Sequence, residues 1–183
     1  MLAEKRYEIL EGLPTYGTMP VTVSDNNDPF YSEGYVVRFY KKDGTDWVAN
    51  FVPGWSKTRG IFELTGSNLL ILADGTCYVM DPENTAPISV FGVGFSAVFE
   101  LPDGRFVLQD QVNLTVVEKD GSYRNSERIS WDGFKDIKVE GTLIKGLCWT
   151  PIDKTNDEWL PFTYDVATGV LTNGAFSTYT QQI

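Results

Sequence analysis

The residue types that most often carry out catalysis are scarce in this chain of 183 residues. It contains no histidine, so the commonest general base and metal ligand is missing, and with it every Ser-His or Cys-His nucleophile. Its two cysteines, Cys77 and Cys148, are too few for a structural zinc site and are expected to be buried, reduced thiols. We therefore expect no cofactor and no bound metal, and the chemistry that remains rests on carboxylates and aromatic side chains.

Paired carboxylates could still serve a glycosidase, which needs two acids at a suitable distance. Asp103, Asp120 and Asp132 each stand beside a glycine, where an aspartate commonly bonds its own backbone in a turn. Asp110 ends an apolar run and is interpreted first as a satisfied polar group at a strand end. A carboxylate-only hydrolase or lyase acting on glycans would rest on Asp110 and Asp165, and it is the alternative function.

Aromatic residues in loops beside acidic groups favour a protein-binding surface instead. The segment 151–160 is interpreted as a long loop, and large aromatic side chains in loops are typical binding anchors. Trp55 follows Pro53-Gly54 in a second loop, and for both Trp55 and Trp159 the alternative is that the loop packs onto the body of the protein. The oxygen-rich segment 25–30 is the next candidate. The predicted partner-binding residues are Asp153, Asp157, Glu158, Trp159 and Trp55.

A repeat of about 37 residues indicates how these side chains are positioned. The stretch 62–72 aligns without a gap on 99–109, and one deletion brings in 137–144. Each copy reads as a strand, a glycine turn and a second strand. Such repeats mark supersecondary units that cannot bury their apolar faces alone. We predict that Gly66, Gly104 and Gly141 occupy equivalent turns, and that the second-strand residues Leu70, Val107 and Ile144 are buried.

Turn signals every 8 to 14 residues and short alternating runs predict an all-β fold. The clearest copy predicts strands at 95–101, 105–110, 114–118 and 123–130. We expect one domain over 1–183, made of about four repeated four-stranded antiparallel units of about 37–40 residues. The units are predicted at 7–55, 56–94, 95–132 and 133–176, the first being the least regular.

In layout, each predicted unit resembles a blade of a β-propeller. The Gly-His and Trp-Asp signatures of WD repeats are missing apart from Trp131-Asp132, and four units are few for a closed ring. The alternatives are a partial propeller that closes as a homodimer, and an antiparallel sandwich or barrel built from the same hairpins.

The net charge of −10 narrows the choice of partner. Residues 61–183 hold 17 acidic against 8 basic groups, which disfavours binding to nucleic acid or an anionic membrane and favours a basic protein. No apolar run is long enough to span a bilayer and no signal core begins the chain, so a cytoplasmic location is expected. In size, acidity and lack of catalytic residue types the chain resembles bacterial immunity proteins of polymorphic toxin systems. That resemblance implies a non-catalytic inhibitor of a protein partner.

Overall fold

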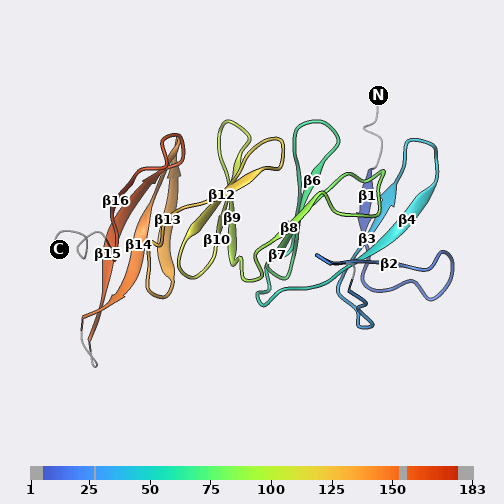
Figure 1. Ribbon diagram of the computed structural model, residues 1–183, viewed down its shortest axis with the longest axis horizontal. Coiled ribbons are helices and arrows are strands. Elements are labelled where there is room, and N and C mark those ends of the chain that lie inside the picture. Colours follow the sequence, from blue (N-terminus) through green and yellow to red (C-terminus); the bar gives the residue numbers. More distant parts are fainter. Residues whose placement is uncertain (1–5, 27, 153–155, 177–183) are drawn as a thin grey trace. The chain divides into compact units, whose positions relative to one another are not determined.

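The computed structural model describes residues 6–26, 28–152 and 156–176 and confirms the predicted fold class. The described residues form sixteen strands in four four-stranded sheets, with no helix among them and no sheet closed into a barrel (Figure 1). The chain divides into two compact units, Met1–Phe95 and Ser96–Ile183, each containing two sheets. The expectation of a single domain stays a prediction. Within the described part, no helix has the length and apolarity needed to cross a membrane.

The first unit contains one irregular sheet and one meander. The first sheet has the strand order β1-β3-β4-β2, and β2 runs parallel to β4. Its predicted antiparallel character is therefore wrong at that edge. The second sheet follows chain order, β5-β6-β7-β8, and is antiparallel throughout. The strands are β1 (Tyr7–Ile9), β2 (Val21–Val23), β3 (Tyr35–Tyr40), β4 (Asp46–Phe51), β5 (Gly60–Glu63), β6 (Leu69–Ala73), β7 (Thr76–Met80) and β8 (Ser89–Phe91).

Side chains alternate between the two faces of each sheet, and this alternation decides which residues form the core of the first unit. In the first sheet Val37, Phe39 and Phe51 face the same side, and in the second sheet Ile71 and Tyr78 do so. These residues form one buried cluster, so the two sheets pack face to face. Residues on the other face of the second sheet, such as Leu70, are also buried, which explains why 69–72 is a continuous apolar run.

The second unit consists of two regular antiparallel meanders. The third sheet has the order β12-β11-β10-β9 and the fourth β13-β14-β15-β16. Ile144 and Tyr164 from the fourth sheet join Val107 and Val116 from the third in a second buried cluster. The strands are β9 (Ala97–Glu100), β10 (Phe106–Gln109), β11 (Leu114–Val117), β12 (Tyr123–Asn125), β13 (Phe134–Glu140), β14 (Leu143–Pro151), β15 (Asp157–Asp165) and β16 (Leu171–Asn173).

Both predictions drawn from the repeat are confirmed. Leu70, Val107 and Ile144 are fully buried. Gly66, Gly104 and Gly141 each lie in the turn between the first and second strand of their sheet, with φ of 81°, 82° and 63°. The turns differ in length, because five residues separate the strands in the first two sheets of the repeat and two in the last. A positive φ carries no steric cost for glycine, which explains why glycine recurs there.

Three turns share one sequence pattern, in which Asp stands third and Gly fourth of five residues. In the turns 41–45, 101–105 and 118–122, the backbone N–H of the first residue donates to the backbone carbonyl of the fifth at an N···O distance of 2.8 Å. The carboxylates of Asp43, Asp103 and Asp120 accept the N–H of the fifth residue at 2.9, 3.1 and 2.9 Å. Each carboxylate also accepts a hydrogen bond from the side chain of that fifth residue, and this bond together with the backbone bond lowers the pKa of each carboxyl group. The turn interpretation of Asp103 and Asp120 is therefore confirmed.

Cys77 and Cys148 are buried free thiols, and burial raises the pKa of both. Since the thiolate is the reactive form, we expect the folded protein to react with iodoacetamide at pH 8 at least about tenfold more slowly than the urea-unfolded chain. The measurement is mass spectrometry of timed samples. Labelling of either cysteine at the same rate in both states would contradict this burial.

Candidate functional site

Among the described residues of the segment predicted as a long loop at 151–160, Pro151 and 157–160 belong to two paired strands, so that prediction is wrong for them. β14 continues to Pro151 and β15 begins at Asp157, with Trp149 paired opposite Trp159. The last pair between β13 and β14 is at Cys148 and the last between β15 and β16 is at Phe162. Three residue pairs of the hairpin therefore extend beyond both neighbouring strands.

Strand alternation separates the predicted binding residues of this hairpin. Asp157 and Trp159 share a face, while Glu158 lies on the other face. Trp149 Nε1 donates to Asp157 Oδ2 at 2.7 Å, and Lys135 Nζ lies 4.2 Å from the centre of the Trp159 ring. The carboxylate and the ring are thus both engaged within the hairpin's own sheet. Asp153 lies outside the described residues.

Four residues of the fallback segment, Asp25, Asp28, Pro29 and Phe30, instead line a pocket of about 350 Å³ in the first unit. The connection from β2 to β3 contributes one side of this pocket, and the rest comes from the chain after β4, from β7 and β8, and from the chain after β8. We call it the acidic pocket. Its lining comprises Ser24, Asp25, Asp28, Pro29, Phe30, Val52, Pro53, Thr76, Tyr78, Val90, Phe91, Gly92 and Val93.

The floor of the acidic pocket is buried and largely aromatic, whereas its rim is exposed. Tyr78, Phe91 and Thr76 on the floor are at least nine-tenths buried, and Asp25 and Asp28 on the rim are exposed. The Tyr78 hydroxyl donates to Val52 O at 2.7 Å. Burial raises the pKa of Tyr78, and the nearby negative charge of Asp25 raises it further. Tyr78 therefore stays a neutral hydrogen-bond donor at physiological pH.

The two rim carboxylates differ from the turn aspartates described above. No hydrogen bond or ion pair joins the side chain of Asp25 or Asp28 to any other described residue. The carboxylate of each turn aspartate accepts the backbone N–H two residues later, and these hydrogen bonds stabilise the fold. Asp25 and Asp28 have no such structural task, and their lone pairs remain available to a ligand.

Trp55 stands beside this pocket with its side chain 87% exposed, so the alternative of packing onto the body is wrong for it. Its backbone is nevertheless firmly held. Trp55 N–H donates to Val93 O at 2.6 Å, and the flanking Gly54 and Ser56 N–H groups donate to Ala73 O and Asp74 O. An exposed aromatic side chain on a backbone bonded from both sides is preorganised for contact with a partner.

Sequence reasoning proposed Trp55 and the segment 25–30 separately and missed the residues that join them. Tyr78, Phe91 and Val93 come from strands and turns that read only as core or connection in the sequence. Val93 carried one usable signal, because it is an apolar residue between two glycines, and the structure leaves it 44% exposed. Convergence of segments more than 60 residues apart has no local signature.

A larger pocket of about 660 Å³ lies at the opposite end of the same unit, among the turns after β3, β5 and β7. Its charged residues have both signs. Arg6 pairs with Glu63 and donates to Ser67 O, and the Lys42 N–H donates to Glu83 Oε1 at 3.1 Å. Since part of this charge is already balanced internally, the larger pocket indicates no particular ligand.

The carboxylate pair of the alternative enzyme is not brought together. The turn after Asp110 is hydrogen-bonded through Gly133 to the Trp149 end of β14, whereas Asp165 pairs with Leu143 at the other end. Six residues of extended strand correspond to about 20 Å. The two acids of a glycosidase lie within about 10 Å. Asp110 and Asp165 therefore cannot act on the same bond.

Both of these aspartates also have structural hydrogen bonds. Asp110 Oδ1 accepts the N–H groups of Val112 and Asn113 at 2.7 and 2.8 Å, which confirms its interpretation as a satisfied strand-end group. Asp165 accepts the Ala167 N–H and the Thr168 hydroxyl, each at 2.9 Å, and these bonds lower its pKa. In the described part of the chain, no three His, Cys, Asp or Glu side chains are placed to hold a metal ion.

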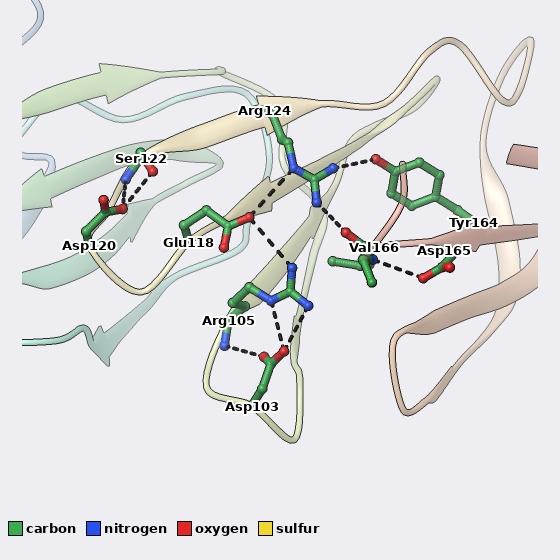
Figure 2. A network of polar contacts seen from close by, with 10 residues as sticks. Asp103, Arg105, Glu118, Asp120, Ser122, Arg124, Tyr164, Asp165 and Val166 are labelled. Atoms are coloured by element: carbon green, nitrogen blue, oxygen red, sulfur yellow. Dashed lines mark hydrogen bonds and ion pairs between the residues drawn. The ribbon is translucent and has the colours of Figure 1, made fainter. Parts of the chain in front are cut away.

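A network of charged side chains in the second unit fixes the third sheet to the fourth (Figure 2). Glu118 lies 3.7 Å from Arg105 and 3.6 Å from Arg124, and Arg105 also pairs with Asp103 at 2.8 Å. Arg124 donates to the Tyr164 hydroxyl at 3.0 Å and to the carbonyl of Val166. Two arginines thus balance two carboxylates, and we assign this network to packing of the two sheets.

Comparison with known proteins identifies no family for this chain. No protein-family model matches it, and no curated protein sequence matches it.

Proposed function

We propose that this protein is a non-catalytic binding module that holds a basic protein partner. The observation that carries the proposal is the acidic pocket, where Asp25 and Asp28 have no hydrogen-bond or ion-pair partner among the described residues and where the exposed Trp55 is bonded through its backbone to Val93 of the pocket wall. Interfaces take most of their binding free energy from a few large aromatic or arginine anchors, and complementary charge raises the rate of association. The net charge of −10 acts in the same direction on a basic partner.

The activity that fits this surface is inhibition by occlusion, as in the immunity proteins that the chain resembles in size and charge. Such a protein needs a rigid surface and no catalytic group. The hairpin carrying Asp157, Glu158 and Trp159 is a second proposed contact, since its exposed acids would also favour a basic partner. A cytoplasmic location remains part of this proposal.

We expect Trp55→Ala to weaken partner binding about 30-fold, chiefly through faster dissociation, because the variant removes an anchor and leaves the charge unchanged. The Asp25→Asn/Asp28→Asn variant should mainly slow association, and the difference should shrink in 0.5 M salt. The partner is first captured from the native organism and identified, and binding of the purified pair is then measured by surface plasmon resonance.

The charge-matched control is Asp132→Asn/Asp136→Asn, which removes two exposed carboxylates from the second unit. Trp159→Ala and Asp157→Asn/Glu158→Gln test the hairpin in the same way. If Trp55→Ala and Asp25→Asn/Asp28→Asn both bind like the parent while remaining folded, the acidic pocket is not the interface. Effects confined to the hairpin variants would move the interface there.

A further inference from the structure

The acidic pocket has the features of a receptor for one long cationic side chain. We propose that it binds the side chain of an arginine contributed by the protein partner, an inference that rests on the proposed function. The apolar stem would lie against the aromatic floor and the guanidinium would pair with the rim carboxylates. Three properties of the pocket support this assignment: its walls, its charge and an unused hydroxyl on its floor.

The walls suit a long side chain with an apolar stem. The floor is formed by Tyr78 and Phe91, and Phe30 and Val90 are partly buried beside them. The volume of about 350 Å³ lies at the lower end of the range for small-molecule sites. Arginine and lysine bury their methylene groups along apolar surface while their charged ends stay near polar groups. A short acidic or amide side chain would leave the aromatic floor uncovered.

The charge of the pocket has one sign. Asp25 and Asp28 line it, and none of its described lining residues is a lysine or arginine. Neither carboxylate has a partner among the described residues, so a cation entering the pocket replaces no internal ion pair. An anion would instead meet two negative charges at the rim. This charge complementarity selects a basic occupant over a neutral apolar one.

The floor also offers a polar group without an internal partner. Thr76 is 6% exposed, lines the pocket, and its hydroxyl makes no hydrogen bond to another described residue. A threonine hydroxyl that lines a pocket and has no partner within the protein can accept a bond from a ligand N–H. A guanidinium carries five such N–H donors, so it can bond Thr76 and a carboxylate together.

Arginine fits these walls better than lysine does. A guanidinium is planar, more weakly hydrated than an ammonium, and stacks on aromatic faces such as those of Phe91 or Phe30. Its fork of donors can also engage a carboxylate through two parallel hydrogen bonds. A lysine ammonium would lose more hydration on entering an aromatic pocket and would gain fewer directed bonds.

The test needs no knowledge of the partner. The ¹⁵N-labelled full chain is titrated with N-acetyl-arginine N-methylamide, and amide shifts are followed at Thr76, Gly92 and Val93. A ligand of this size should bind with a dissociation constant on the order of 1 mM. Asp25→Asn/Asp28→Asn should weaken binding at least about tenfold, and 0.5 M NaCl should weaken binding to the parent. Asp132→Asn/Asp136→Asn should bind like the parent.

Two further probes test whether binding needs the positive charge and whether the pocket prefers arginine to lysine. N-acetyl-citrulline N-methylamide has nearly the shape of the arginine probe without its charge, and equal binding of the two would overturn the role of the carboxylates. Equal or tighter binding of the lysine analogue would overturn the choice of arginine. Absence of shifts at the pocket with the arginine probe would overturn the inference entirely. Partner binding that still depends on Trp55 would then leave the proposed function standing without an arginine receptor.

Discussion

Val107→Asp is expected to unfold the second unit or to lower its melting temperature by more than about 10 °C. Val107 is fully buried in the cluster that joins the third and fourth sheets, and it pairs with Phe99 on one side and Val116 on the other. A carboxylate there would have no water and no cation. The cost is several kcal/mol, a large part of the 5–15 kcal/mol that typically stabilises a domain.

Two variants separate charge from packing in that experiment. Val107→Ala leaves a small cavity and should cost about 1–2 kcal/mol. Thr172→Asp places the same charge on an exposed strand position of the same unit and should change stability by about 0.5 kcal/mol or less. Circular dichroism melts of all three are compared with the parent. Val107→Asp melting within a few degrees of Thr172→Asp would show that Val107 is not in a core.

The sequence predicted the regular sheets well because their information is local. The Asp-Gly turns at 43–44, 103–104 and 120–121 fix both the chain reversal and the register of the strands beside them. Alternation then decides which side chains face the core. The predicted strands of the clearest copy, 95–101, 105–110, 114–118 and 123–130, each contain one observed strand from β9 to β12.

The first sheet could not be predicted in the same way. Its β1 and β2 have three residues each, and β2 reaches β4 only by a parallel pairing across the sheet. No turn signal connects strands that are not neighbours in the chain, so their order depends on tertiary packing. This irregular course carries Asp25 and Asp28 to the place where β7 begins and β8 ends, and the acidic pocket follows from it.

The hairpin at the end of β14 was missed for a different reason. Pro151, Asp153 and Asn156 are typical loop residues, and their composition outweighed the alternation that starts at Asp157. The structure pairs Trp149 with Trp159, and large aromatic cross-strand pairs stabilise a hairpin by about 0.2–1 kcal/mol. A tryptophan on each side of a short polar stretch was the available signal.

Gly54→Ala is expected to destabilise the first unit by about 2–3 kcal/mol and to deform the acidic pocket. A Cβ at Gly54 would lie 2.3 Å from Val93 O and 2.7 Å from both Asp74 O and Thr76 N. All three are backbone atoms, so none can move aside as a side-chain end would. Relief requires the segment that carries Trp55 to shift, and overpacking of this kind typically costs 1–3 kcal/mol. Urea unfolding of the variant gives the loss of stability.

Gly94→Ala is the matched control, because it makes the same change of residue type one residue after Val93, in the connection that packs against Gly54. A Cβ at Gly94 meets no atom within 4 Å, and the φ of Gly94 is not positive, so the variant should unfold with the parent. Since Gly54 separates Pro53 in the pocket wall from Trp55, its substitution should also reduce binding of the arginine probe. Unchanged stability of Gly54→Ala would mean that the Trp55 backbone is not packed against Val93, and the case for a preorganised anchor beside the pocket would then fail with it.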